Sequence, residues 1–197
     1  SFPATIFGSG ENWKLVDYIK GFNWLLYEGG KFSTSEKRGI FMDVALKLFP
    51  ADYWRWWLLS NAPESADSNF TWDSFQNTIN KDLADVLGNF IARVTKFSFT
   101  KFGGEIPINN EFGELEKKTI EEIGKHYNSY NYFLSKIEIR KASQELRNIW
   151  VIGNEYLQKS QPWVMFKNDE NKTRMIVRFS FNLIYFYSLI SEPFIPS

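Results

Sequence analysis

The amino-acid sequence predicts a mainly α-helical fold, in which a helical bundle follows a small segment of strand, loop and short helix. Beyond residue 40, apolar residues recur at the spacing of amphipathic helices over most of the chain. Before residue 40, the aromatic run Phe22 to Tyr27 has the length of a strand. Of the 197 residues, 44% are hydrophobic, which is enough to build a sizeable core.

The N-terminal segment, residues 1–30, is predicted to be loop with one short strand. The strand is Phe22 to Tyr27, and Gly29-Gly30 directly after it indicates a tight turn. The first residues, Ser1-Phe2-Pro3, do not resemble a signal peptide, because they have neither a basic region nor a long apolar core.

Two short helices are predicted next. In Phe41 to Phe49, four apolar side chains share one helical face: Phe41, Val44, Ala45 and Leu48. Pro50 fits the first turn of the second helix, where its missing N–H costs nothing. The second helix carries several large aromatic side chains, of which we expect Trp57 to be buried with Tyr53. We expect either Trp54 or Trp56 to face the neighbouring domain.

The longest predicted helix runs from about Thr71 to about Phe99. Thr71 fits the N-cap position. The helix has an apolar stripe formed by Leu83, Val86, Leu87, Phe90, Val94 and Phe97. Its opposing polar stripe is formed by Asp82, Asp85, Asn89, Arg93 and Lys96. Phe102-Gly103-Gly104 and Pro107 end the helix.

Four more helices are predicted: Glu114 to Ser135, Ile139 to Lys159, a short helix after Pro162, and Lys172 to Ser191. The charge-rich stretch from Glu114 to Glu122 is expected to be solvated. We place a domain boundary between residues 69 and 70, so that residues 70–197 form the bundle. The apolar stretch Met175 to Ile190 contains Arg178 and is shorter than the ~20 apolar residues that a membrane span needs.

Composition excludes several kinds of site. The 23 Lys and Arg residues balance 23 Asp and Glu residues, so a nucleic-acid partner would have to be bound by local contacts. The absence of cysteine excludes disulfides and thiolate metal sites. A single histidine, His126, excludes a multi-histidine metal site. We expect no metal site, no membrane partner and no DNA partner.

The loop at residues 29–35, Gly-Gly-Lys-Phe-Ser-Thr-Ser, is a candidate phosphate-binding loop. Glycines allow a close backbone approach, Lys31 offers an ammonium group, and the hydroxyls add neutral donors. The same loop could also be an ordinary hairpin turn with exposed polar residues.

The context of this loop is similar to methionyl-tRNA synthetases, which are class I aminoacyl-tRNA synthetases. The resemblance begins with Tyr27 to Ser35, Arg38-Gly39-Ile40-Phe41 and Asp43, and continues with Pro50 to Leu59. Phe70-Thr71-Trp72 and Asn80 to Phe90 resemble the start of the anticodon-binding bundle of that family. The similarity fades after about residue 105.

The resemblance implies that the loop is a variant of the KMSKS signature. In that family the loop stabilises the pyrophosphate leaving group while the carboxylate of methionine attacks the α-phosphate of ATP. Lys31 and Ser35 match the first and last residues of the signature, and Ser33 lies between them. The resemblance thus implies catalytic roles for Lys31, Ser33 and Ser35, and ATP contacts for Lys31 and Thr34.

Thr34 departs from the family pattern, which has a second lysine there. Threonine cannot supply that positive charge, and our hypothesis is that Lys37 or Arg38 supplies it instead. The alternative is that Lys37 and Arg38 contact tRNA phosphates or solvent.

Three residues are candidates for anticodon recognition. Asn89 and Arg93 are four residues apart and therefore share a helix face, which could also be an ordinary solvated face. Trp163 follows Pro162 at a predicted helix start, where a tryptophan is commonly a core anchor. The resemblance implies that Asn89 and Arg93 read the anticodon and that the Trp163 indole stacks on its first base.

The prediction is therefore the C-terminal part of a methionine–tRNA ligase, with both chain ends cut and the N-terminal catalytic half missing. The full enzyme would use ATP and Mg²⁺, with neither bound to this fragment alone. Its partner would be tRNA(Met), recognised by the CAU anticodon, and its location would be cytoplasmic. Without a His-x-Gly-His segment the fragment should not aminoacylate tRNA.

Two alternatives stay open. Another class I synthetase, of the branched-chain or cysteine type, shares the order of loop and bundle but is not expected to combine Asn89, Arg93 and Trp163. A non-catalytic helical binding module, in which the loop is a coincidence, would not bind a CAU stem-loop.

Overall fold

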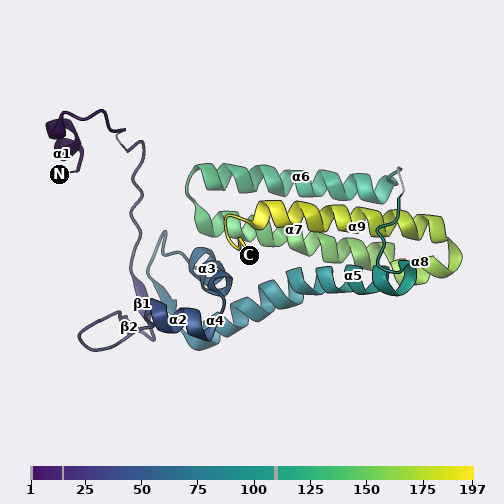
Figure 1. The fold of residues 1–197 in the computed structure, drawn as a ribbon, viewed down its shortest axis with the longest axis horizontal. Coiled ribbons are helices and arrows are strands. Elements are labelled where there is room, and N and C mark those ends of the chain that lie inside the picture. The colour runs from purple at the N-terminus through teal and green to yellow at the C-terminus, as the bar shows by residue number, and fades with distance from the viewer. Residues whose placement is uncertain (1, 15, 109–110) are drawn as a thin grey trace.

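A computed structural model describes residues 2–14, 16–108 and 111–197 of the chain (Figure 1). Four long helices lie side by side in the larger part of the molecule: α5 (Asn89–Phe102), α6 (Glu114–Ser135), α7 (Ile139–Ser160) and α9 (Glu170–Ser191). A small sheet and three of the shorter helices, α2 (Met42–Leu48), α3 (Ala51–Ser60) and α4 (Trp72–Thr78), lie at one end of this bundle (Figure 1). The predicted mainly α fold is confirmed.

The N-terminal segment contains a helix that the sequence did not predict, α1 (Phe2–Ser9). It lies at the end of an extended segment, away from the bundle (Figure 1). No side chain from Pro3 to Ser9 is buried. The apolar residues of α1 do not gather on one helical face, so the sequence offered no amphipathic pattern and the prediction of loop was wrong here.

The sheet has three short strands in the order β2-β1-β3: β1 (Leu25–Tyr27), β2 (Gly30–Lys31) and β3 (Ser68–Phe70). β1 is antiparallel to β2 and parallel to β3. The turn between β1 and β2 uses positive φ angles at Glu28 (46°) and Gly29 (78°), as the Gly-Gly signal predicted. β1 begins later than Phe22, because Asn23 N donates instead to the Pro63 carbonyl in the loop before β3.

Helices α2 (Met42–Leu48) and α3 (Ala51–Ser60) confirm the two predicted short helices. Pro50 is the residue before α3 and not in its first turn. The predicted apolar face of α2 is mostly open to solvent: Ala45 is buried, whereas Val44 and Leu48 are 45% and 51% exposed. Among the described residues, the Trp54 indole covers α2 near Ala45, donating to its carbonyl at 2.9 Å.

The tryptophans of α3 connect the small sheet region to the bundle. Trp57 is buried as predicted, but Tyr53 is exposed, so the expectation that the two are buried together is wrong. Trp56 is also buried, and its ring lies 4.8 Å from that of Trp150 on α7. The expected contact of one tryptophan with the neighbouring domain is therefore confirmed for Trp56.

The longest predicted helix is a continuous rod that changes its winding. It consists of α4 (Trp72–Thr78), the π-helix η1 (Ile79–Gly88) and α5. Thr71 caps its start by accepting a hydrogen bond from Ser74 N at 3.1 Å. Gly103 ends it with a left-handed φ of 66°.

The π-helix overturns part of the predicted polar stripe. A π-turn holds more residues than an α-turn, so the faces rotate relative to an α-helical projection. Asp82, predicted on the solvated stripe, is buried. It accepts hydrogen bonds from Trp56 Nε1 at 3.2 Å and from Arg147 Nε at 2.5 Å.

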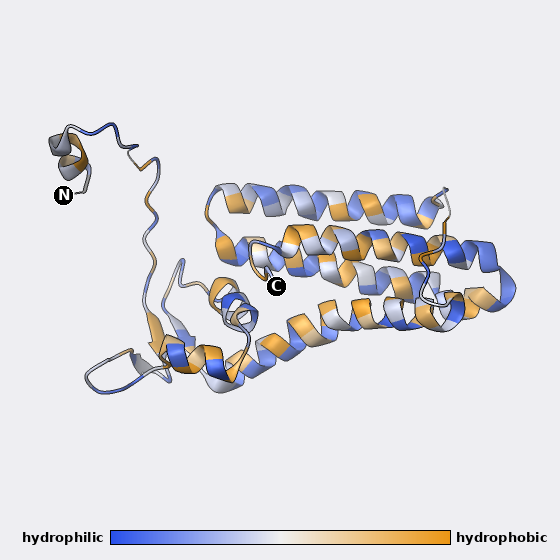
Figure 2. Cartoon of the chain, in the orientation of Figure 1, coloured by the Kyte–Doolittle hydropathy of each residue, from blue (hydrophilic) through white to orange (hydrophobic). Residues whose placement is uncertain are grey.

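The remaining helices confirm their predicted ranges within two residues, with α8 (Pro162–Asn168) as the short helix after Pro162. Hydrophobic and hydrophilic residues alternate in bands along them, as in amphipathic helices (Figure 2). Two residues of the stretch predicted to be solvated, Glu116 and Thr119, are buried. Glu116 accepts a hydrogen bond from Tyr156 Oη at 2.6 Å.

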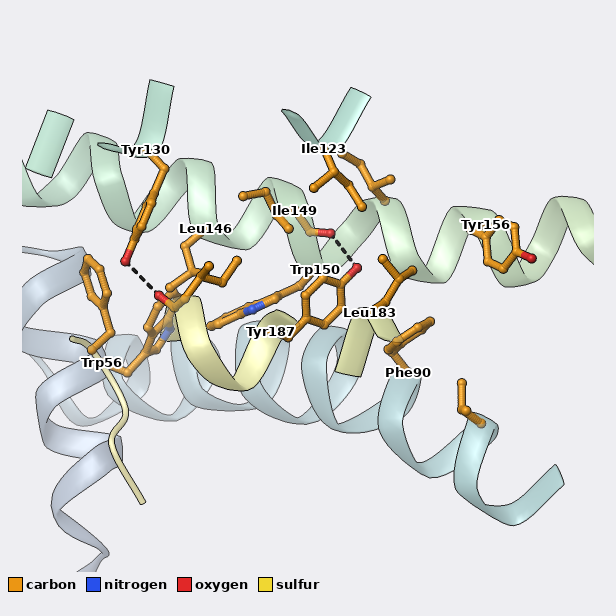
Figure 3. Close-up of a cluster of buried hydrophobic side chains, with 14 of the residues drawn as sticks. Trp56, Phe90, Ile123, Tyr130, Leu146, Ile149, Trp150, Tyr156, Leu183 and Tyr187 are labelled. Carbon is orange, nitrogen blue, oxygen red and sulfur yellow. Dashed lines mark hydrogen bonds between the residues drawn. The ribbon is translucent and has the colours of Figure 1, made fainter. Parts of the chain in front are cut away.

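The core lies where α3, the long rod, α6, α7 and α9 meet (Figure 3). Two of its tyrosine hydroxyls are bonded to backbone groups: Tyr187 Oη donates to the Ile149 carbonyl and Tyr130 Oη to the Ile190 carbonyl (Figure 3). The largest fully buried side chains include Trp56, Trp57, Trp150, Tyr156, Tyr187 and Phe90. Within the described residues, no helix is both long and apolar enough to cross a membrane.

Candidate functional site

Two of the three candidate recognition residues, Arg93 and Trp163, are in direct contact. Arg93 Cζ lies 4.9 Å from the centre of the Trp163 ring, within the range of a cation–π contact. Arg93 is on α5 and Trp163 on α8. Asn89, one turn before Arg93, has an exposed side chain at the first position of α5.

The backbone before α8 explains why the Trp163 indole is accessible. Gln161 is the residue between α7 and α8, and it has a left-handed φ of 44°. Pro162 follows at the first helical position, where its fixed φ suits the helix, and its side chain is buried. Trp163 itself is 40% exposed, so it is not the fully buried core anchor that the alternative interpretation required.

The π-helix ends directly before Asn89. A Cβ on Gly88 would lie 2.9 Å from the Leu83 carbonyl oxygen, so the close approach at this turn requires glycine.

A mostly apolar cavity of about 310 Å³ lies beside Arg93 and Trp163. Its walls come from α5, α8, α9 and the end of α7, and the lining includes Phe97, Leu157, Pro162, Ile176 and Val177. Lys96 and Thr100 also line it. An exposed indole, a guanidinium and an apolar cavity together suit an unpaired base, which stacks on aromatic faces and carries polar edges.

The segment at residues 29–35 contains strand β2 and leads into a second, tight turn at residues 34–37. Ser33 and Arg38 form an antiparallel bridge, with Ser33 N donating to the Arg38 carbonyl at 3.0 Å and Arg38 N to the Ser33 carbonyl at 2.9 Å. The hydroxyl groups of Ser33 and Ser35 lie 3.2 Å apart. Ser33 Oγ also accepts a hydrogen bond from Glu36 N at 3.2 Å.

The cationic side chains in and directly after this loop, Lys31, Lys37 and Arg38, have different surroundings. Lys31 Nζ is 5.6 Å from the centre of the Trp24 ring. The Arg38 guanidinium lies against Gly30 in the space that a Cβ would occupy, and 3.9 Å from the Glu36 carboxylate. Lys37 is exposed and has a left-handed φ of 52°. Arg38 is therefore the cation that folds back beside strand β2, which carries Lys31.

The loop and the Arg93–Trp163 contact lie at opposite ends of the molecule, with β2 at one end and α8 at the other (Figure 1). Within the described residues, no three carboxylate or imidazole side chains cluster closely enough to hold a metal ion. His126 instead pairs with Glu145 at 2.6 Å.

One residue near the site was not singled out from the sequence. Asn154, on α7, accepts a hydrogen bond from Asn89 Nδ2 at 3.3 Å. A signal was present, because Asn154 stands among the buried residues Trp150, Ile152, Gly153, Tyr156 and Leu157. An amide on the inward side of an amphipathic helix needs a polar partner.

Two family models match this chain over separate ranges. Residues 1–95 match the model "tRNA synthetases class I (M)". Residues 106–197 match the model "Anticodon binding domain of methionyl tRNA ligase". The first match ends inside the long rod, and the second begins after the rod has ended at Phe102.

Curated relatives include a methionine–tRNA ligase of Paracoccus denitrificans (strain Pd 1222), 59% identical over 196 residues, and one of Dinoroseobacter shibae (strain DSM 16493 / NCIMB 14021 / DFL 12), 57% identical over 196 residues. Each alignment covers 100% of this chain and 34% of the relative. The chain thus spans about a third of the length of the curated relatives that it matches.

Solved structures with the same fold include two of Mycobacterium tuberculosis methionyl-tRNA synthetase. One, in complex with methionyl-adenylate, has a TM-score of 0.85 at 23% identity, over 100% of this chain and 39% of that one. The other, the apo form, has a TM-score of 0.80 at 22% identity, over 99% of this chain and 38% of that one.

Proposed function

Because the chain belongs to the methionyl-tRNA synthetase family, we propose that it supplies the anticodon-binding domain and the signature loop of a methionine–tRNA ligase. Residues 1–69 would contribute to the catalytic region, and residues 70–197 would bind tRNA(Met) through its CAU anticodon. This boundary falls inside β3 (Ser68–Phe70), close to the point where the sheet ends and the long rod begins at Trp72.

The contact between Arg93 and Trp163 is the observation that carries this proposal. The guanidinium stacks on an indole that is 40% exposed beside an apolar cavity. A splayed anticodon base can stack on the indole, while Arg93 and Asn89 offer hydrogen bonds to its edge. The partner recognised by these groups is a single-stranded loop, in keeping with the balanced net charge of the chain.

The loop at residues 29–35 would bind the phosphates of ATP at the other end of the molecule. Lys31 is exposed, and the Ser33 and Ser35 hydroxyls lie 3.2 Å apart, so all three can turn toward one phosphate group. Thr34 can donate a hydrogen bond but no charge. We assign the second positive charge to Arg38 in preference to Lys37, because the Arg38 side chain folds back over Gly30, next to Lys31.

These groups fit the triphosphate of ATP, which is a substrate, but not a metal ion by themselves. The donors in the loop are cationic or neutral, and they can stabilise the charge that develops on pyrophosphate as it leaves. Mg²⁺ would be carried mainly by the phosphate oxygens, as is usual for this ion. We place the enzyme in the cytoplasm, where its tRNA partner is used.

Titration of the chain with a CAU anticodon stem-loop tests the proposed function. We expect binding at low salt, because a chain with balanced charges gains little from phosphate contacts. Trp163→Ala should weaken it by about tenfold or more, since stacking on one base contributes ~1–3 kcal/mol. Trp13→Ala is the matched control, because Trp13 is 65% exposed and lies in the extended N-terminal segment.

Two results would contradict the proposal. Absence of binding to any stem-loop would favour a helical binding module with a different partner. Equal binding of stem-loops that carry isoleucine or cysteine anticodons would favour another class I synthetase.

A further inference from the structure

We propose that Asn154 is a positioning residue, which fixes the orientation of the Asn89 amide and so lets Asn89 distinguish cytosine from uracil. This inference rests on the proposed function, since it assumes that Asn89 faces an anticodon base. It concerns a residue whose partly buried amide is hydrogen-bonded to Asn89 and to the Val86 carbonyl.

The Asn154 amide is held by two backbone carbonyls. Its Nδ2 donates to the Val86 carbonyl at 2.9 Å and to the Trp150 carbonyl at 3.4 Å. Carbonyl oxygens only accept hydrogen bonds, so the nitrogen of Asn154 has to face them. The amide oxygen of Asn154 must then point the other way, toward Asn89.

The orientation of Asn89 follows from that of Asn154. Asn89 Nδ2 lies 3.3 Å from Asn154 Oδ1 and donates to it. Because that oxygen only accepts, the reversed orientation of Asn89 would bring two acceptor oxygens together. Asn89 is therefore left with its own oxygen as an acceptor and one N–H as a donor, in a fixed order, for a ligand.

The close packing of α7 makes this chain of hydrogen bonds possible. A Cβ on Gly153, the residue before Asn154, would lie 2.5 Å from Tyr187 Oη and 3.1 Å from the Phe90 ring. The glycine thus lets α7 approach the residue that directly follows Asn89. Asn154 can in consequence reach both Val86 in the π-helix and Asn89 in α5.

A fixed order of acceptor and donor distinguishes the two pyrimidines. Cytosine presents an amino donor next to the acceptor N3, whereas uracil presents a carbonyl acceptor next to a donor N3–H. If stacking on Trp163 sets the position of the base, the Asn89 oxygen can accept from the amino group of cytosine while its N–H donates to N3. Uracil presents the reverse order and cannot make both bonds. An exposed amide that could turn over would pair with either.

The test is the ratio of the dissociation constants for CAU and UAU stem-loops. We expect the wild-type chain to bind the CAU stem-loop more tightly, and Asn154→Ala to reduce this preference by about tenfold. Asn148→Ala is the matched control: Asn148 is on the same helix, but its Oδ1 accepts from Gln144. That variant should keep the wild-type ratio.

Asn154→Asp separates positioning from a merely structural role. A carboxylate keeps the oxygen that accepts from Asn89, so this variant should retain the CAU preference even if its negative charge weakens both complexes. If Asn154 had only a structural role, Asn154→Asp would lose more of the CAU preference than Asn154→Ala. The reason is that a carboxylate facing the Val86 and Trp150 carbonyls disturbs the fold more than alanine does.

An unchanged ratio in Asn154→Ala, or an equal loss of affinity for both stem-loops, would overturn this inference. In that case Trp163→Ala still weakens binding and the proposed function stands. If the wild-type chain binds neither stem-loop, the proposed function and this inference are both wrong.

Discussion

The guanidinium of Arg93 stacks on the indole of Trp163, with 4.9 Å between Cζ and the ring centre. The two residues come from helices α5 and α8, which are separated in sequence by the whole of α6 and α7. The contact places a planar cation over an indole that is 40% exposed.

We predict that Arg93→Lys lowers the affinity for a CAU stem-loop by about tenfold although it keeps the charge. Lysine lacks the planar group that stacks on Trp163 and makes a fork of hydrogen bonds. Isothermal titration of both proteins measures the change. Arg140→Lys, at an exposed position at the start of α7, is the control and should bind as the wild type does. Equal affinity of Arg93→Lys and wild type would show that the charge alone matters.

The loop prediction concerns the positive charge that Thr34 lacks. In a protein that also contains the nucleotide-binding region, Arg38→Ala should reduce the ATP–pyrophosphate exchange rate by at least about tenfold, because it removes a donor to the leaving group. Lys37→Ala should have a smaller effect. The affinity for methionine should change little in either variant. Unchanged exchange in both variants would contradict the hypothesis.

The buried ion pair of Asp82 gives a prediction of stability. Arg147→Met should lower the free energy of unfolding by about 2 kcal/mol, because it leaves the Asp82 carboxylate with one partner, the Trp56 indole. Urea denaturation followed by circular dichroism measures this. Lys159→Met removes a surface pair with Glu155 and should cost less than about 0.5 kcal/mol. A similar cost for both variants would show that burial of Asp82 is unimportant.

Tyr130 gives a prediction of alkaline stability. Burial raises the pKa of its phenol from 10.0 to about 12, because the charged form is poorly solvated in the core. The folded state therefore holds this proton more tightly than the unfolded state. The resulting stability is present below pH ~10 and is lost as the pH rises from about 10 to about 12.

Tyr130→Phe should accordingly show a smaller loss of unfolding free energy over this range than the wild type. At neutral pH it should cost about 1 kcal/mol, because the Ile190 carbonyl loses its hydrogen bond. Chemical denaturation at a series of pH values measures both effects. Tyr132→Phe, on the same helix but 57% exposed, should follow the wild-type curve. Parallel curves for Tyr130→Phe and wild type would contradict the prediction.

Local patterns in the sequence were enough to predict most helix boundaries. Thr71 accepts the capping hydrogen bond that its position indicated, and Pro162 begins α8. The same patterns failed where the helix changes its winding. Asp82 was assigned to the solvated stripe from a regular α-helical projection, but the π-helix brings it into the core.

Exposure was harder to predict than secondary structure. Val44 and Leu48 have the spacing of a buried face, yet they are exposed because no described helix covers that side of α2. Glu116 stands in a charge-rich stretch, yet it is buried because Tyr156, on the next helix, donates to it. In both cases exposure depends on whether another helix packs there, among the described residues, and a local sequence pattern does not contain that information.

The sequence by itself determined most of the helices and the hairpin turn, because spacing, caps and glycines act within a few neighbouring residues. It also singled out the residues that we propose bind tRNA. The tertiary structure alone decided that Arg93 stacks on Trp163, that Arg38 covers Gly30, and that Asn154 orients Asn89. Asn89 and Asn154 are 65 residues apart, and Asp82 and Arg147 are equally far apart. Contacts of this kind depend on how whole helices pack, which no short sequence pattern records.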